Sequence, residues 1–418
     1  MTGLKAGYGE KVITPPLGVE LSGYGFYLER RAASILDDLK ARAVCLERGE
    51  DRVLFVVCDL VGFTVETSDA VRDRISAATN IPRPNIMLAC THTHSGPASM
   101  PLPGLGEIEP EYAAALPAAI ASAAVSAARD VRPAEFSYAF ETLEPLGYNR
   151  RSGNFEAVDP VLKAAYLRRD GDRIMLLGYA CHAVVLGRSR AVSADWPGAA
   201  VRAAEAEGWK AVVFQGFCGD IDPVTNINRW GEGTADDLRL YGGLVAGRAL
   251  KAEKSAAKPA DVRLAAAESR IKIPLAVPPR DHLDREVASF LEKNSRFPRA
   301  DKFAAAWREA AEKAWEKSAA RPFLDAVPIQ AIDVGGLKFI GLPGEAFASF
   351  TKSYGRAGVP VFTVGYANGD IGYLPGRAAF ADPGDYAAYC APKFYSLFPF
   401  TADLEDILVR EGRALIGG

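Results

Sequence analysis

The chain has 418 residues, of which 49% are hydrophobic, so it can bury a sizeable core and is not an intrinsically disordered protein. Its net charge is −3 and its acidic and basic residues are interleaved, which excludes the strongly basic surface typical of nucleic-acid-binding proteins. We therefore expect a folded protein that acts on a small molecule and not on nucleic acid.

Targeting signals are not evident at the start of the chain. The first ten residues lack the basic segment and apolar stretch of a secretory signal. The most apolar runs, such as residues 53–60 and 174–180, are too short to span a bilayer. We expect a cytoplasmic protein without stable membrane association, and the sequence leaves its oligomeric state open.

Six cysteines lie far apart in the chain, at positions 45, 58, 90, 181, 218 and 390. None forms a C-x-x-C pair, so a thiolate metal site or a redox dithiol is not indicated. We expect free, buried thiols. Cys90 and Cys181 each precede a histidine of interest, and we interpret both as core residues at strand ends.

Strands and helices are predicted to alternate along the chain. Residues 42–46 and 53–58 are expected to pair around a turn at Gly49-Glu50-Asp51. Helices are predicted at residues 65–78, 110–128, 197–207 and 235–257. Further strands are predicted at residues 85–90, 174–180, 211–215, 264–274, 330–334 and 337–341. This alternation predicts an α/β fold with a largely internal sheet, whose active loops follow the strand ends.

Residues 280–320 differ in character, being rich in Lys, Arg, Glu and Ala with aromatic residues at helical spacing. They predict a helical hairpin inserted into, or packed on, the main body, with its charges forming a solvated face. No internal repeat or low-complexity linker marks a domain boundary, so we expect residues 1–418 to form a single layered domain with a mixed sheet and helices packed around it.

Four histidines occur, and three of them follow predicted strands: His92, His94 and His182. His92 and His94 are two residues apart, so on an extended segment their side chains leave the same face. One is expected to be a metal ligand and the other a proton donor or substrate contact. A lone histidine at position 182 would usually be a core residue, but three at strand ends favour one shared site. His282 lies among charged residues and is interpreted as structural.

A catalytic zinc ion commonly takes three protein ligands and a water molecule, so a further ligand is expected near another strand end. Glu345 meets this expectation, because it follows the strand at residues 337–341 and a Leu-Pro-Gly turn. It is predicted to open an apolar helix. In the alternative interpretation, Glu345 only stabilises the N-terminus of that helix through the helix dipole.

Eight short motifs occur in the order that one enzyme family shows. They span residues 7–16, 39–43, 91–97, 149–150, 181–183, 219–223, 343–345 and 368–373. Together they resemble the N-terminal catalytic domain of the neutral/alkaline, non-lysosomal ceramidase family and its shorter bacterial relatives. T-H-T-H-S-G-P at residues 91–97 is fairly specific, and the resemblance reaches from Gly7 to about Tyr386.

The resemblance implies a zinc site and a set of residues that act on the substrate. Zinc would be bound by His92, His182, Glu345 and Tyr373. His94 and Arg150 would face the substrate, and Tyr386 would match a further active-site tyrosine. The implied mechanism is hydrolysis by a metal-activated water, in which His94 stabilises the oxyanion or protonates the leaving group and Arg150 holds a carboxylate or the oxyanion. Alternatively, Arg150 forms a surface ion pair and Arg151 takes its role.

The sequence departs from the family at Asp222, where the family's ceramidases carry a serine. An aspartate there can act as a base, bind a cationic or hydroxylated group, or cap the following turn. Whether Asp220 and Asp222 hold a second metal stays open. The chain ends at Gly418, without the C-terminal β-sandwich domain of the secreted ceramidases, and shows no secretion signal. These departures predict a smaller, more soluble substrate than ceramide.

Three hypotheses follow for the function. The first is a zinc-dependent hydrolase that cleaves an amide or related acyl bond of a soluble substrate, which Arg188 and Arg190 suggest is acidic. The second is a metal-dependent carbohydrate-processing enzyme, such as a lyase on a uronate-like substrate. The third is a binding protein that keeps the fold without catalysis.

Overall fold

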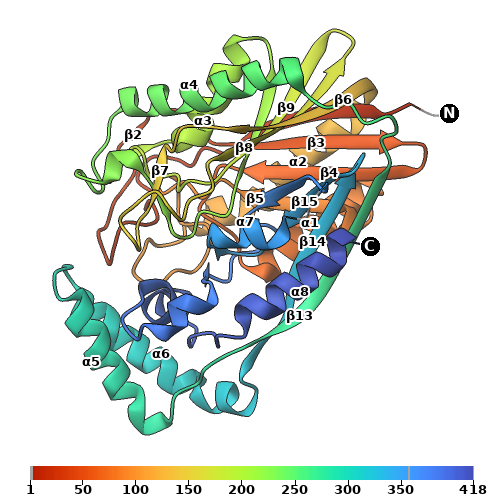
Figure 1. The fold of residues 1–418 in the computed structure, drawn as a ribbon. Coiled ribbons are helices and arrows are strands. Elements are labelled where there is room, and N and C mark those ends of the chain that lie inside the picture. Colours follow the sequence, from red (N-terminus) through yellow and green to blue (C-terminus); the bar gives the residue numbers. More distant parts are fainter. Residues whose placement is uncertain (1–2, 356–357, 418) are drawn as a thin grey trace.

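Two large β-sheets form the middle of the molecule, as the computed structural model of residues 3–355 and 358–417 shows (Figure 1). The larger sheet has the strand order β11-β9-β8-β6-β1-β3-β4-β5. Its strands are β1 (Lys5–Val12), β3 (Lys40–Arg48), β4 (Asp51–Cys58), β5 (Ile86–Cys90), β6 (Arg132–Thr142), β8 (Val161–Arg169), β9 (Asp172–Tyr179) and β11 (Lys210–Gln215). The smaller sheet has the order β13-β14-β15-β17, with β13 (Leu264–Pro274), β14 (Phe323–Val334), β15 (Leu337–Gly341) and β17 (Val361–Val364).

The two sheets pack face to face through an aromatic core. Phe55 of β4 lies 4.7 Å from Phe339 of β15, measured between ring centroids, and Phe339 stacks on Phe362 of β17 at 4.5 Å. β14 is buried on both faces, since Ile329 packs towards the helices and Ile332 towards the larger sheet. A strand that is buried on both faces needs apolar residues on each face, and from Val327 to Val334 only Gln330 and Asp333 interrupt the apolar run of β14.

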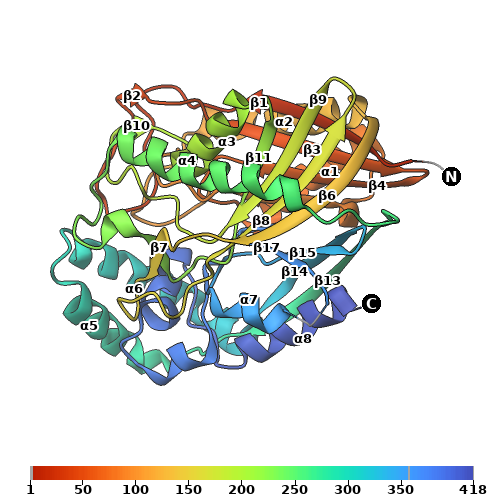
Figure 2. The ribbon, with the colours of Figure 1, turned by 45° about the horizontal axis from the view of Figure 1, so that its top comes forward.

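Helices cover the outer face of each sheet, which gives four layers (Figures 1 and 2). The larger sheet is covered by α1 (Val65–Thr79), α2 (Pro110–Arg129), α3 (Asp195–Ala206) and α4 (Ala235–Ala252). The smaller sheet is covered by α7 (Ser349–Tyr354) and α8 (Leu404–Gly417), and the hairpin of α5 (Leu283–Asn294) and α6 (Ala300–Ala320) lies beyond one end of this sheet (Figure 1). The predicted layered α/β fold with a mixed sheet is confirmed, and the predicted helical hairpin is present.

Within the described residues, α2 is the one helix that is long and apolar enough to cross a membrane by length and composition. One face of α2 packs against the sheet. β1 approaches it so closely that a Cβ atom at Gly7 would lie 2.0 Å from the carbonyl oxygen of Ala127, and one at Gly9 would lie 2.3 Å from that of Ala123. The glycines of β1 are therefore required for this helix to reach the sheet.

The larger sheet curves until its two edge strands approach each other. Gln215 ends β11, at one edge of the sheet, and its Nε2 donates to the carbonyl oxygen of Thr91, just beyond β5 at the other edge (3.0 Å). The backbone N–H of Cys181 donates to Oε1 of the same glutamine (3.4 Å). One buried side chain thus joins the segments that carry His92 and His182.

Most predicted elements are present within a few residues of their predicted bounds, and all six cysteines are free and buried as expected. Strands β1, β6, β8 and β17 were not predicted. Short strand pairs complete the fold: β2 (Ser34–Ile35) with β10 (Ala191–Val192), β7 (Gly147–Asn149) with β12 (Ile221–Pro223), and β16 (Glu345–Ala346) with β18 (Tyr373–Leu374).

The prediction that Glu345 opens a helix is wrong. Glu345 lies in β16, its backbone N–H donates to the carbonyl oxygen of Gly372 (2.9 Å), and the next helix begins only at Ser349. The residues after Glu345 are apolar because they are buried, and a short apolar run has no periodicity that separates a strand from a helix.

Candidate metal centre

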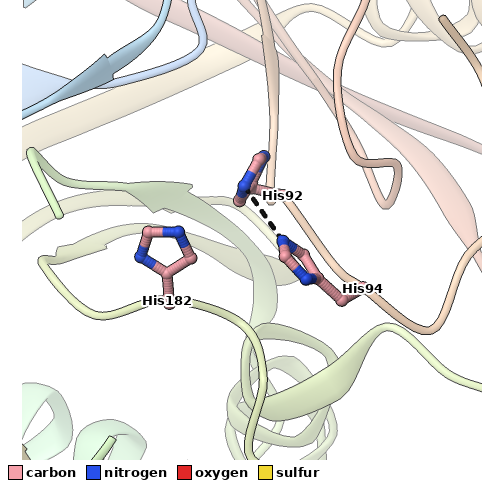
Figure 3. A group of neighbouring side chains, drawn as sticks. All are labelled: His92, His94 and His182. Atoms are coloured by element: carbon pink, nitrogen blue, oxygen red, sulfur yellow. Dashed lines mark hydrogen bonds between the residues drawn. The ribbon is translucent and has the colours of Figure 1, made fainter. Parts of the chain in front are cut away.

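Three histidines converge in one cluster (Figure 3), and the carboxylate of Glu345 faces two of them. The ligand nitrogens of His92, His94 and His182 all lie within 4.8 Å of one another. The Nε2 atoms of His92 and His94 are 3.1 Å apart. Oε2 of Glu345 lies 3.0 Å from Nε2 of His182 and 3.6 Å from Nε2 of His92. The structure therefore brings together four of the residues that the sequence singled out.

His92 follows β5 with a left-handed backbone, at a φ of 59°. The expectation that His92 and His94 lie on an extended segment is therefore wrong, although both rings reach the same point. Left-handed residues other than glycine are uncommon and are enriched at functional sites. Nδ1 of His92 donates to the carbonyl oxygen of Val61 (2.6 Å), and its ring stacks on Tyr366 with centroids 4.1 Å apart. These contacts fix the ring with the lone pair of Nε2 facing Glu345.

His182 is held in the same way at the end of another strand of the larger sheet. It follows β9, and its Nδ1 donates to the carbonyl oxygen of Cys218 (2.8 Å), so Nε2 points at Glu345. A metal-binding histidine almost always donates its second ring N–H to such an acceptor. His92 and His182 both meet this condition.

His94 does not meet that condition. Its Nδ1 is buried and has no hydrogen-bond partner in the part of the chain that the structure describes. The backbone of Gly23 packs against this nitrogen so closely that a Cβ atom would lie 2.4 Å from it. Because Nε2 of His92 carries a lone pair, Nε2 of His94 is the donor between the two rings. His94 thus offers an N–H to the centre of the cluster.

Burial and charge set the protonation of the cluster. Burial lowers the pKa of His92 to about 4, so its ring is neutral at pH 7. Burial and the neighbouring rings of His92 and His182 lower the pKa of His94 well below its usual value. Burial also disfavours the charged form of His182, but Cys218 and Glu345 outweigh it and raise this pKa to about 10. Burial would raise the pKa of Glu345, yet the facing His92 and His182 bring it down to about 2.

Glu345 and Tyr373 are direct neighbours in the parallel pair β16–β18. The hydroxyl of Tyr395 donates to Oε1 of Glu345 (2.7 Å), which leaves Oε2 to face the histidines. Tyr373 accepts a hydrogen bond from Arg150 at its hydroxyl oxygen (2.6 Å), and a nearby cation favours a polarised phenol oxygen. Burial outweighs the effect of Arg150 and raises the pKa of Tyr373 well above its usual value, so Tyr373 lies beside the cluster as a neutral phenol.

Arg150 faces this cluster, whereas Arg151 turns away to pair with Asp385 (2.6 Å). The guanidinium of Arg150 donates to Tyr373, to the carbonyl oxygen of Gly219 (2.7 Å) and to Asp222 (3.2 Å). Asp222 is buried, and the ion pair balances the charge of both residues. Arg150 therefore has a fixed position beside Tyr373 and is not a surface residue.

The remaining sequence-selected residues lie around the cluster. Tyr386 contacts the ring of Tyr373 edge-on (5.6 Å between centroids) but is 46% exposed, so it lies at the entrance. Both carboxylate oxygens of Asp220 are used within the protein, one by the backbone N–H of Ala348 and one by Asn149. Asp220 thus fixes the turn after β16. His282 lies apart from the cluster, beside Arg285.

Sequence reasoning missed several residues that hold the cluster in place. Tyr366, Tyr395 and Gln215 are buried or half-buried and contact the histidine segments or Glu345. Tyr366 lies two residues before the motif at residues 368–373, so its proximity to that motif could have indicated a role in the site. Tyr395 and Gln215 carry no local signal, because their role depends on contacts with distant parts of the chain.

The donor set fits a divalent transition metal. The Nε2 atoms of His92 and His182 and Oε2 of Glu345 point at the same place. In the metal-free protein a proton between His182 and Glu345 relieves the repulsion between their lone pairs, and a bound cation would replace this proton. Imidazole and carboxylate ligands in this combination suit zinc and related ions. His92, His182 and Glu345 are the residues that would hold such an ion, with Tyr373 beside them.

Comparison with known proteins identifies a family and a fold. Residues 4–211 match the family described as neutral/alkaline non-lysosomal ceramidase, N-terminal. The chain belongs to this family. Its family membership classes the chain as a hydrolase, and the resemblance that the motifs indicated is confirmed. Among curated protein sequences, none matches the chain.

Two solved structures share the fold of this ceramidase-family chain. One is the neutral ceramidase from Pseudomonas aeruginosa, with 20% sequence identity and a TM-score of 0.74. The other is a ceramidase complexed with C2, with 18% identity and a TM-score of 0.75. Both alignments cover 100% of this chain and 75% of the other. At these identities the likeness establishes the layered fold, and the chemistry has to be argued from the residues.

Proposed function

We propose that the chain is a cytoplasmic, zinc-dependent hydrolase that cleaves an amide or related acyl bond of a soluble, acidic small molecule. The observation that carries this proposal is the convergence of His92, His182 and Glu345, each oriented by a second hydrogen bond to a carbonyl or a phenol. Zinc bound there supplies Lewis acidity, which polarises a carbonyl and makes water a stronger nucleophile near neutral pH.

The groups around the cluster are suited to acyl transfer. His94 directs its Nε2–H into the cluster and is neutral, so it can donate a hydrogen bond to an oxygen that becomes negative or protonate a leaving nitrogen. Arg150, whose charge Asp222 balances, keeps its guanidinium beside the cluster, where it can donate a hydrogen bond to the same oxygen or to a substrate carboxylate. Tyr386, at the entrance, is placed to contact the bound substrate.

Asp222 supports a substrate other than ceramide. The position is buried and its carboxylate pairs with Arg150, so the side of the cluster where the family's ceramidases carry a serine hydroxyl here carries a charge pair. A buried charge pair favours a polar group of the substrate over a lipid chain, because an apolar group there would leave polar atoms without partners. We therefore propose a smaller and more polar acyl compound.

The proposal is tested by comparing three histidine variants. His92→Ala removes a ligand, so bound zinc and activity should both be lost. His94→Ala should retain zinc but lose activity by about 100- to 10,000-fold, the usual contribution of a general acid or base. His282→Ala, outside the cluster, should match wild type. Zinc is measured by elemental analysis, and activity on a panel of acyl amides and acidic sugars.

The outcomes separate the three hypotheses. Full zinc content and activity in His92→Ala would refute the proposed site. A product without an added water, detected by mass, would favour elimination by a lyase. Zinc binding without turnover of any compound in the panel would favour a binding protein.

A further inference from the structure

A row of side chains leads from His94 to the protein surface. The ring of Tyr24 contacts His94 edge-on, with centroids 5.2 Å apart. Trp230 contacts Tyr24 edge-on at 6.2 Å, and the guanidinium of Arg188 lies 5.5 Å from the centroid of Trp230. Tyr24 is buried, whereas Trp230 is 44% exposed and Arg188 is exposed. The row thus connects the catalytic cluster to solvent.

The hydroxyl group of Tyr24 is buried without a hydrogen-bond partner in the described part of the chain. Buried hydroxyl groups are nearly always hydrogen-bonded, because an unpaired one is costly. Tyr24 also has a left-handed backbone, with a φ of 69°, which is unusual for an aromatic residue. A constrained side chain whose hydroxyl group has no partner can form a hydrogen bond with a ligand.

Two guanidiniums, those of Arg30 and Arg188, and two carboxylates, those of Asp195 and Asp222, lie near this hydroxyl group. Among the described residues, the guanidinium of Arg188 forms no ion pair and lies over the ring of Trp230. Arg30 is buried with its guanidinium 4.8 Å from the centroid of Tyr24, and it donates only to carbonyl oxygens, those of Ser22, His94 and Ser189.

The acidic groups nearby already have partners. Asp222 pairs with Arg150. Asp195 accepts three backbone N–H groups at the start of α3. Asp195 is thus the one nearby carboxylate without a cation among the residues that the structure describes, and burial raises its pKa to about 6. Set against the two guanidiniums of Arg30 and Arg188, it leaves the region around Tyr24 with a net positive charge and a free donor. Such a region attracts an anion.

We infer that Tyr24, Arg188 and Trp230 form a subsite that binds an anionic group of the substrate, several bonds away from the bond that is cleaved. A guanidinium that stacks on an indole leaves its N–H edge free for a carboxylate or phosphate, which it can bind through two hydrogen bonds. The hydroxyl of Tyr24 donates to the same group. The inference rests on the proposed function, because it describes how an acyl substrate is oriented towards His94.

The test compares two ligands of nearly equal shape that differ in charge: N-octanoyl-L-glutamate and N-octanoyl-L-glutamine. Binding to the zinc-loaded protein is measured by titration calorimetry. The wild type should bind the glutamate compound about 10- to 100-fold more tightly, since a charge-assisted pair of hydrogen bonds contributes this much. N-octanoyl-O-phosphoserine, measured in parallel, shows whether a phosphate is preferred over a carboxylate.

Variants assign this preference to the subsite. Arg188→Gln should bind both compounds equally, at the affinity of the neutral one. Tyr24→Phe, which removes only the hydroxyl group, should weaken binding of the glutamate compound several-fold. Arg190→Gln is the matched control, because Arg190 is exposed in the same loop and donates only to the carbonyl oxygen of Arg31 in the described structure. It should keep the preference.

Equal binding of both compounds to wild type, absence of binding, or a preference that survives in Arg188→Gln would overturn the inference. A different result would contradict the proposed function. A charge preference in binding without hydrolysis of either compound would contradict the hydrolase and leave the subsite intact. Hydrolysis of both compounds at equal rates and with equal affinities would support the hydrolase and contradict the subsite.

Discussion

Tyr395 is the residue that fixes the carboxylate of Glu345. Its hydroxyl holds Oε1 at 2.7 Å and so directs Oε2 at the two histidines. Loss of such an outer hydrogen bond typically weakens metal binding about 10- to 100-fold. We predict a decrease of this size for Tyr395→Phe, measured by competition with a chelator. Tyr389→Phe removes a hydroxyl that, among the described residues, donates only to the carbonyl oxygen of Phe380, and this variant should bind zinc like wild type. Equal zinc affinity in both variants would contradict a positioning role.

Protonation of His182 predicts how metal binding depends on pH. In the metal-free protein the pKa of His182 is raised to about 10 and that of Glu345 is lowered to about 2, so between these values the pair carries one proton. A metal binds only the neutral imidazole, and one proton must leave.

We therefore predict that zinc affinity rises about tenfold per pH unit between pH 6 and 8. Calorimetry in buffers of different ionisation enthalpy should detect about one released proton per zinc. His92 contributes none, because its pKa is lowered to about 4 and it is already neutral in this range. An affinity independent of pH would show that the pair carries no proton.

At the scale of elements, the two-residue strands β16 and β18 decide whether Glu345 reaches the histidines. They lie so close that a Cβ atom at Gly344 would be 2.3 Å from the carbonyl oxygen of Gly372. Gly344→Ala should push β16 away, lower the free energy of unfolding by about 1–3 kcal/mol and reduce bound zinc.

The control is Gly243→Ala in α4, where a Cβ atom would meet nothing within 4 Å. An alanine in this exposed helical position should raise stability by about 0.5–1 kcal/mol and leave zinc content unchanged. Urea unfolding and elemental analysis measure both effects. Normal zinc content in Gly344→Ala would show that β16 can shift without moving Glu345.

The elements also show what the sequence could and could not predict. Segments with a strong pattern, such as α1 and β4, were predicted within a few residues of their bounds. The buried face of the helix α1 and the continuous apolar run of the strand β4 are both visible in the local sequence. β16 was not, because its two residues are a strand only through their pairing with β18, 28 residues later in the chain. The convergence of His92 and His94 was predicted from an extended backbone, whereas the left-handed φ of His92 produces it.

At the scale of the whole molecule, the candidate centre joins the two sheets. His92 and His182 follow β5 and β9 of the larger sheet, whereas Glu345 and Tyr373 belong to the segments that follow β15 and β17 of the smaller one. Below the centre, the sheets are held together by the aromatic core around Phe339. A metal bound here would link the two sheets at the strand ends that carry these loops, which the aromatic core does not reach.

Removal of the metal should therefore destabilise the whole fold by a measurable amount. With free zinc at 100 times its dissociation constant, binding stabilises the native state by about 2.7 kcal/mol. For a chain of 418 residues the entropy of unfolding is about 0.9 kcal/mol/K, so a chelator should lower Tm by about 3 °C. The Tm of His92→Ala, which lacks a ligand, should not respond to zinc or chelator. If zinc raised Tm equally in both proteins, it would be binding elsewhere, and the link between the sheets would be refuted.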